Sequence, residues 1–289
     1  MQRWNLGDVA ITTIPEIDIE LEGGKPGSII PSATAREVAA MPWLAPHYAT
    51  PDGRLKIAIQ AIVIDTGRER ILVDPGIGNG RQRRSPIYHM LQTPFLDELK
   101  AAGYSRDAIT CVINTHLHMD HVGWNTMWQE GRWVPTFPKA RYLIPRGDFE
   151  FYSASDDTDR QTMLADSVLP VVEAGIVEFF DGDTRVASEV SLISTPGHSP
   201  AHASVVVAAG ELRAVITGDV LHSPSQIAHP EWSSGFDVDQ EGSRATRMAF
   251  LCEYADERTL VIGTHFPAPS AGQVARDGDG YHFVTRSQR

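Results

Sequence analysis

The segment Ile113–Gly123, INTHLHMDHVG, constrains the fold of this chain more than any other part of its sequence. Although the chain has only 11 histidines, six consecutive positions contain His116, His118, Asp120 and His121. The preceding run, AITCVINT, is apolar and β-branched, which predicts a buried strand ending near Thr115. The polar side chains would then leave the sheet in one loop and converge, with Asp120 and His121 opening a short helix that Asp120 caps.

Three further side chains of the same chemistry each follow an apolar run that reads as a strand. His198 lies in SLISTPGHSPAH, Asp219 in AVITGDVLH and His265 in LVIGTHFPAP. Imidazole and carboxylate groups are ligands of zinc, and strand ends at one edge of a sheet share a crevice. Seven such donors exceed the needs of one tetrahedral ion but suit two ions about 3.5–4 Å apart. We therefore expect two divalent metal ions, with zinc as the metal and Asp219 as the bridging carboxylate.

The composition limits the class of protein. A chain of 289 residues, 42% hydrophobic and 21% charged, is typical of a globular protein that buries a core without disulfides. Two cysteines, no signal-peptide pattern at the N-terminus and no run of 18 apolar residues predict a cytoplasmic enzyme without membrane contact. The net charge of −12 repels phosphate backbones, so we expect a small-molecule substrate and no nucleic-acid partner.

The order of the elements predicts a layered α/β or α+β architecture, with sheets inside and helices outside. Helical patterns occupy residues 93–104, 160–174 and 241–256. Strand patterns alternate with them, and the expected strands lie at residues 8–15, 56–66, 68–76, 108–115, 140–145, 176–180, 189–195, 203–210, 212–219 and 259–265.

The segment Glu20–Arg54 is rich in proline and glycine, and two interpretations of it stay open. It is either a surface excursion or a lid over a pocket, because long irregular segments in compact domains are often functional. As a lid, it would bring Trp43 and Tyr48 to the substrate.

Two clusters near the histidine motif also allow two interpretations each. The basic run RQRR, with Arg81, Arg83 and Arg84, is either a solvated loop or a site for an anionic substrate group. The tryptophans that follow the motif either pack in the core or line an apolar pocket wall; they are Trp124, Trp128 and Trp133.

Together these motifs resemble the metallo-β-lactamase superfamily. The similarity rests on H-x-H-x-D-H at His116–His121, on TPGHSP, TGD and GTH further along the chain, and on ILVDPG near residue 74. It spans residues 60 to 266 approximately and implies one domain, residues 1–289, with a four-layer αβ/βα sandwich. The two sheets of such a fold lie face to face with helices outside.

The resemblance also implies a ligand set. His116, His118 and His198 would bind the first metal, Asp120, His121 and His265 the second, and Asp219 would bridge them. A histidine at 118 argues against the flavodiiron branch, and an aspartate at 219 against most true β-lactamases. Mononuclear iron persulfide dioxygenases share many of these ligands, so an iron-dependent sulfur dioxygenase stays an alternative.

The stretch GDVLHSPSQIAHPEW separates branches within the superfamily. His222 lies three residues beyond Asp219, where quorum-quenching lactonases often carry tyrosine. The methyl parathion hydrolase-like branch carries a similar GD-x-x-H pattern, and the chain resembles that branch together with related lactonases and esterases. His222 would hydrogen-bond the substrate carbonyl or leaving group, or else support a metal ligand.

The expected function is therefore dinuclear zinc-dependent hydrolysis of an ester or lactone bond by a metal-bridging hydroxide. Asp120 and His222 are the expected catalytic residues: Asp120 would orient the nucleophile or carry its proton to the leaving group. Phosphotriester hydrolysis and hydrolytic dehalogenation use the same centre and stay open. We expect Asp74 and His202 to support ligand histidines, and a homodimer is one option by analogy with related enzymes.

Overall fold

A computed structural model describes residues 1–285 of the chain. These residues form two compact units. Unit 1 contains Arg3–Ile17 and Ile59–Ala187, and unit 2 contains Asp18–Ala58 together with Ser188 and the residues that follow. Each unit has a hydrophobic core of its own.

Unit 1 is built on a seven-stranded sheet in the order β1-β2-β3-β4-β5-β8-β9. The strands are β1 (Arg3–Leu6), β2 (Val9–Leu21), β3 (Leu55–Asp65), β4 (Arg70–Val73), β5 (Cys111–Ile113), β8 (Arg141–Pro145) and β9 (Val177–Phe180). β4, β5, β8 and β9 pair in parallel, with Val73 opposite Ile113 and Ile113 opposite Leu143. Because these strands are parallel, the residues that follow Val73 and Ile113 emerge at the same edge of the sheet.

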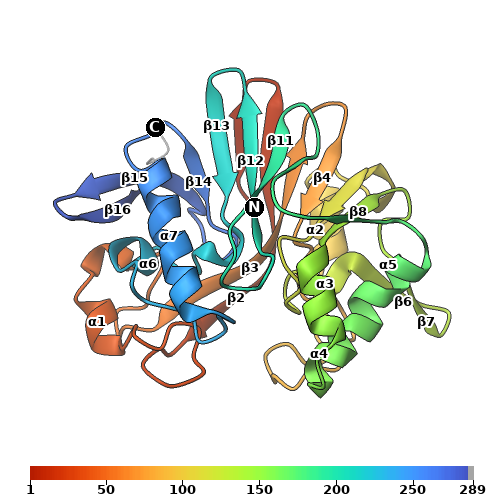
Figure 1. The fold of residues 1–289 in the computed structure, drawn as a ribbon, viewed down its shortest axis with the longest axis horizontal. Coiled ribbons are helices and arrows are strands. Elements are labelled where there is room, and N and C mark those ends of the chain that lie inside the picture. Colours follow the sequence, from red (N-terminus) through yellow and green to blue (C-terminus); the bar gives the residue numbers. More distant parts are fainter. Residues whose placement is uncertain (286–289) are drawn as a thin grey trace. The chain divides into compact units, whose positions relative to one another are not determined.

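The helices and the remaining strands of unit 1 lie in the connections between β4 and β9 (Figure 1). A separate hairpin pairs β6 with β7. The elements are α2 (Phe95–Ala101), η2 (Arg106–Ala108), η3 (Gly123–Asn125), β6 (Thr126–Gln129), β7 (Arg132–Pro135), α3 (Arg146–Ser153), α4 (Thr158–Met163), the π-helical turn η4 (Leu164–Val168) and α5 (Leu169–Glu173). Side chains from the sheet and from these helices share one buried cluster, which includes Leu72, Phe95, Val112, Tyr142 and Val168.

A buried ion-pair network joins the loop after β4 to η4. Arg81 Nη1 and Arg83 Nη1 contact the Asp166 carboxylate at 2.9 and 2.6 Å, and both side chains have no exposed surface. Arg81 also donates hydrogen bonds to the carbonyl oxygens of Gly123 and Thr126, and its guanidinium lies 4.2 Å from the centre of the Trp133 ring. Arg81 and Arg83 therefore neither lie in a solvated loop nor bind an anionic substrate group. Both guanidinium groups are buried in ion pairs with Asp166 inside unit 1.

Unit 2 is built on the sheet β10-β11-β12-β13-β14-β15-β16. Its strands are β10 (Thr184–Arg185), β11 (Val190–Ser194), β12 (Ala203–Ala209), β13 (Leu212–Ile216), β14 (Leu260–Ile262), β15 (Ala271–Asp277) and β16 (Gly280–Val284), and its other elements are α1 (Ala35–Ala39), η1 (Pro42–Leu44), η5 (Gly218–Val220), α6 (Ser225–Ala228) and α7 (Gln240–Tyr254). β13 and β14 are parallel, with Ile216 opposite Ile262, whereas β11 with β12, β12 with β13, β14 with β15 and β15 with β16 are antiparallel.

Helix α7 is the longest helix within residues 1–285, and it packs against β15 (Figure 1). Asp239 caps it by accepting a hydrogen bond from the Gly242 amide at 2.9 Å. Its buried residues recur at helical spacing and present one face to the unit 2 core; they are Ser243, Arg247, Phe250, Leu251 and Tyr254.

The segment Glu20–Arg54 has little regular secondary structure beyond α1 and η1, but part of it packs in the unit 2 core. Its buried side chains pack with those of α7 and β14; they include Ile30, Val38, Leu44 and Tyr48. Tyr48 donates a hydrogen bond to the Pro269 carbonyl at 2.6 Å and is 3% exposed, so it packs inside unit 2 and cannot meet a substrate as expected of a lid. Trp43 is 40% exposed.

Among the helices of residues 1–285, none combines the length and the apolar character needed to cross a bilayer.

We predict that Asp166→Ala lowers the free energy of unfolding by about 3–5 kcal/mol, because it leaves two buried guanidinium groups without their carboxylate. Glu178→Ala is the matched control. It removes the carboxylate of an ion pair with Arg141 whose side chains are 57% and 32% exposed, and it should cost less than about 1 kcal/mol. Urea denaturation of both variants measures the difference, and equal losses would contradict the prediction.

Candidate functional site

In unit 1, the histidine cluster begins directly beyond β5, at the edge where β4 also ends. Asp74 follows Val73, and Thr115 and His116 follow Ile113 by two and three positions. The Asp74 carboxylate accepts hydrogen bonds from the Thr115 amide at 2.8 Å and the Thr115 hydroxyl at 2.7 Å. Because β4 and β5 are parallel neighbours, the Asp74 carboxylate in the loop after β4 lies beside the loop after β5 that carries His116.

Asp74 orients two of the cluster's imidazoles. The Thr115 hydroxyl, which donates to Asp74, lies 3.0 Å from His116 Nδ1 and can accept its proton. Asp74 Oδ2 itself lies 3.1 Å from Nδ1 of His121. With Nδ1 of His116 held by the Thr115 hydroxyl and Nδ1 of His121 facing the Asp74 carboxylate, Nε2 of each ring is the nitrogen that can bind a metal ion. This geometry matches the expectation that Asp74 supports a histidine of the cluster.

His118 and Asp120 complete the unit 1 donors. His118 Nδ1 lies 3.0 Å from His116 Nε2, and the two rings are nearly perpendicular. An Asp120 oxygen lies 3.8 Å from His121 Nε2, and the Asp120 side chain is 16% exposed. The expected Asp120-capped helix is wrong: Asp120 and His121 lie in a turn, and the short helix η3 starts at Gly123 without a side-chain cap.

Gly123 is required where the two loops of unit 1 touch. Its amide donates to the Gly76 carbonyl at 2.7 Å, and a Cβ atom at this position would lie 1.8 Å from the Ile77 carbonyl oxygen. Any other residue would therefore separate the loop after Asp74 from the segment after His121.

In unit 2, three imidazoles surround one carboxylate. Asp219 follows β13 and His265 follows β14, so the parallel pair again delivers both to one edge. Asp219 Oδ2 lies 3.1 Å from His198 Nε2 and 3.2 Å from His222 Nε2, while Oδ1 lies 3.1 Å from His265 Nε2. All four side chains are buried.

Each of these donors is oriented from its far side. His265 Nδ1 donates to the Ala58 carbonyl at 2.9 Å, and His198 Nδ1 donates to Asp237 Oδ1 at 2.8 Å. The Asp219 amide donates to His202 Nε2 at 2.8 Å, and the His202 ring also packs edge-on against His198, with ring centres 5.9 Å apart, so His202 supports both residues. Nε2 is consequently the outward nitrogen in both His198 and His265.

The carboxylates set different charge states for two of the unit 2 histidines. Burial lowers the pKa of His198, but the charges of Asp219 and Asp237 and the hydrogen bonds to them outweigh burial and raise it to about 9. For His222, burial outweighs the attraction of Asp219 and lowers the pKa, so its imidazole is neutral near pH 7. The structure gives neither His222 ring nitrogen a hydrogen bond.

Two supporting carboxylates were not identifiable from the sequence. Asp237 lies in a loop before α7, and its contact with His198 spans 39 positions. Asp148, in α3, accepts a hydrogen bond at 3.2 Å from the amide of Leu117, the residue between His116 and His118. Neither lies near a recognisable motif, although FDVD before a helical pattern offers a weak capping signal.

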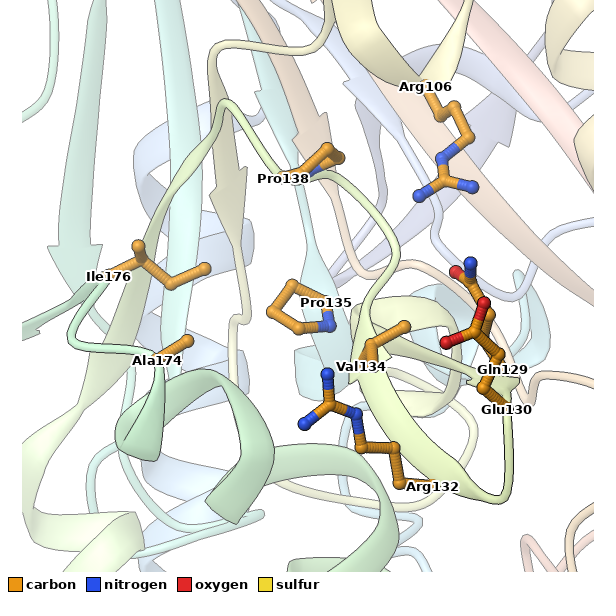
Figure 2. A pocket seen from close by; sticks show the side chains of 9 residues that line it. All are labelled: Arg106, Gln129, Glu130, Arg132, Val134, Pro135, Pro138, Ala174 and Ile176. Atoms are coloured by element: carbon orange, nitrogen blue, oxygen red, sulfur yellow. The ribbon is translucent and has the colours of Figure 1, made fainter.

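The largest cavity described in unit 1 has tryptophan in its wall. It measures about 910 Å³, and its lining includes Trp124, Trp128 and Trp133, of which Trp124 is buried and Trp128 is 56% exposed. Both expected roles of these tryptophans therefore occur together. A smaller cavity of about 460 Å³ lies between Arg106 and Arg132 (Figure 2), and its lining includes none of the expected metal ligands.

The donors in both units suit divalent metal ions. Each expected ligand offers a ring nitrogen or a carboxylate oxygen, in unit 1 from His116, His118, Asp120 and His121 and in unit 2 from His198, Asp219 and His265. Buried imidazoles oriented through Nδ1, with carboxylates beside Nε2, match the ligand chemistry of zinc.

Comparison with known proteins agrees with this chemistry. N-acyl homoserine lactonase AiiA of Bacillus thuringiensis is 24% identical over 212 residues, 69% of this chain and 78% of that protein. A lactonase of Bacillus cereus is 25% identical over the same coverage. Among solved structures, AidC, a dizinc quorum-quenching lactonase, superimposes with a TM-score of 0.83 at 22% identity, covering 100% of this chain and 98% of AidC.

The hydrolase AbOPH has a TM-score of 0.80 at 21% identity, covering 99% of this chain and 97% of its own. The fold is thus the mixed α/β fold of these proteins. Residues 57–265 match the metallo-beta-lactamase superfamily, and this span contains every expected metal ligand. The chain belongs to the metallo-beta-lactamase superfamily and is a metal-dependent hydrolase.

Proposed function

We propose that the protein is a dinuclear zinc hydrolase of ester or lactone bonds. The observation that carries the proposal is the arrangement of imidazoles in both units: each oriented ring turns Nε2 toward a second donor, around Asp219 in unit 2 and beside His118 or Asp120 in unit 1. Such preorganisation is expected of a metal centre and is unneeded in a polar loop. A dizinc lactonase is among the structures that share the fold.

The proposed ligands follow the two donor sets. His116, His118 and His198 would hold one metal ion, Asp120, His121 and His265 would hold the other, and Asp219 would be their shared ligand. Asp219 suits that role, because both of its oxygens already face imidazole Nε2 atoms.

Two bound zinc ions would supply a water of lowered pKa as nucleophile and would polarise the carbonyl that it attacks. Asp120 is the more exposed carboxylate of the set, so it would be the residue that orients the nucleophile and carries its proton to the leaving group. The neutral imidazole of His222 donates a hydrogen bond to the carbonyl oxygen or the leaving group.

The substrate class rests on the relatives. The curated relatives above are N-acyl homoserine lactonases, which favours a lactone over a phosphotriester or an aryl halide. His222 stands where lactonases often carry tyrosine, and its N–H can replace the phenol as the donor. The partner is therefore a small molecule that carries an ester or lactone carbonyl.

Purified protein, assayed against lactones of graded acyl length, aryl esters, a phosphotriester and an aryl halide, tests this proposal. We expect two zinc ions per chain and the highest kcat/KM on a lactone or ester. His265→Ala should lose at least one metal ion and more than about 100-fold in kcat/KM. One iron per chain, together with oxygen uptake on a sulfur substrate, would overturn the proposal.

His222→Phe tests the catalytic role of this histidine. The variant removes the N–H but keeps a flat ring, so we expect kcat to fall about 10- to 100-fold while two metal ions stay bound. His229→Phe, an exposed histidine 39% accessible at its side chain, is the control and should leave kcat unchanged. Loss of metal in His222→Phe would make its role that of a ligand or a support.

The raised pKa of His198 predicts how pH affects the metal-free protein. Because the folded-state pKa of about 9 exceeds the usual 6.5, protonation stabilises the fold fully below pH 6.5, and this contribution is lost as pH rises through 9. Metal-free protein should therefore lose more unfolding free energy between pH 6.5 and 9 than metal-free His198→Asn. Parallel urea titrations at both pH values measure this, and identical pH dependence in the two proteins would contradict it.

A further inference from the structure

We propose that Arg247, on α7, is a positioning residue that holds two of the three expected metal-ligand loops of unit 2, those of His198 and Asp219, in register. The inference rests on the proposed function for the identity of the ligands. Arg247 touches no expected ligand directly, but its guanidinium bonds to the backbone of the segment that carries Asp219 and His222, and it pairs with Asp237, which holds His198.

Arg247 is among the largest side chains in the described part of the chain with less than 2% exposure. Three of its contacts are backbone carbonyls: Nε donates to Val220 at 2.8 Å, and Nη1 donates to Pro230 at 2.9 Å and to Trp232 at 3.0 Å. Nη2 donates to the Ser243 hydroxyl at 3.0 Å. A buried cation with this many fixed partners holds several backbone segments in one geometry.

One set of hydrogen bonds connects Arg247 to the segment that carries Asp219 and His222. Val220, whose carbonyl receives Nε, is the residue directly after Asp219. The Trp232 carbonyl also accepts from Gln226 Nε2 at 2.9 Å, and Gln226 Oε1 accepts from the His222 amide at 2.7 Å. The guanidinium therefore fixes the backbone on either side of the segment that carries both side chains.

A second set of contacts connects Arg247 to His198 through Asp237. Nη2 lies 3.6 Å from Asp237 Oδ2, and Asp237 Oδ1 accepts the His198 Nδ1 hydrogen at 2.8 Å. The amide of Val238 donates to the His198 carbonyl at 3.1 Å, and that of Asp239 donates to the Gly197 carbonyl at 2.9 Å. Asp237 thus orients the ring, while its neighbours fix the backbone of the same loop.

The loop that carries His198 packs closely on α7, so the position of His198 depends on the position of the helix. Gly197 has a φ of +127°, and a Cβ atom there would lie 2.3 Å from the Ser243 amide nitrogen. The His198 loop therefore rests on the first turn of the helix, one turn before Arg247. His198 Nε2 lies 3.1 Å from Asp219 Oδ2, and a shift of α7 would change this distance.

Lysine cannot replace this side chain. The planar guanidinium reaches carbonyls on two sides of its fork and the Asp237 carboxylate at once, whereas an ammonium group is a single point with three donors. A lysine at 247 keeps the charge that offsets Asp237 but leaves some of the carbonyls of Val220, Pro230 and Trp232 without a donor. Charge and positioning can therefore be separated by one substitution.

The test compares Arg247→Lys and Asp237→Asn in the full chain with two controls on α7. Ser243→Ala removes one bond to the guanidinium that leads to no ligand. Phe250→Ala removes a core side chain from the same helix and destabilises it without touching the network. The readouts are zinc affinity by chelator competition, the visible spectrum of Co²⁺-substituted protein, the thermal midpoint, and kcat and KM separately.

We expect Arg247→Lys and Asp237→Asn to weaken zinc binding about 10- to 100-fold and to alter the Co²⁺ spectrum. Ser243→Ala and Phe250→Ala should stay within about threefold of the unchanged protein in zinc affinity, although Phe250→Ala melts at lower temperature. If Phe250→Ala loses as much zinc affinity as Arg247→Lys, the role of Arg247 is ordinary helix stability and the inference fails.

Hydrogen exchange separates this inference from the proposed function. In metal-free protein, Arg247→Lys should accelerate exchange of the Val238 and Asp239 amides, which bond to the His198 loop, while Phe250→Ala accelerates them no more than its other amides. Should the unchanged protein bind no metal at all, the proposed function fails, and this exchange pattern still decides whether Arg247 positions the loop. Unchanged protection of both amides in Arg247→Lys would overturn the inference.

Discussion

A histidine presents a defined nitrogen to a ligand only when its other nitrogen is held, and this constraint governs the candidate site. The Ala58 carbonyl, the Asp237 carboxylate and the Asp74–Thr115 pair each hold an Nδ1 atom. The orientation comes from parallel strand pairs, β4 with β5 and β13 with β14, which deliver a loop from each strand to one edge. The same arrangement thus occurs in both sheets.

Both units place a buried arginine behind their donor loops. Arg81 binds the carbonyls of Gly123 and Thr126, just beyond His121, and Arg247 binds that of Val220, just beyond Asp219. Each guanidinium also has a buried carboxylate, Asp166 or Asp237. Burying an unpaired charge costs free energy, but each of these guanidinium groups has several fixed hydrogen-bond partners and a carboxylate. Each buried arginine can therefore hold the loops that it contacts in one geometry.

Sequence patterns predicted the fold and indicated the candidate donors, because both depend on local signals: apolar strands followed at once by histidine or aspartate. They failed where the outcome depends on distant partners. The run RQRR has the composition of a solvated loop, but Asp166, about 80 positions away, buries two of its arginines. Tyr48 lies in a proline-rich stretch that suggests mobility, yet it packs on Phe266 and Phe283 from the far end of the chain. Asp237 has no motif, and only the fold reveals its contact with His198.

The composition of the unit 2 core has a consequence for biosynthesis. Its buried residues come from Ile29–Ile57 and from Val215–Phe283, with most of unit 1 between them in sequence. A chain leaving the ribosome therefore exposes the apolar side chains of Ile29–Ile57 until nearly the last strand has emerged. Unit 1 is complete once Ala187 has emerged, so the nascent protein passes through a stage in which all of unit 1 is present while the unit 2 core still lacks its C-terminal half.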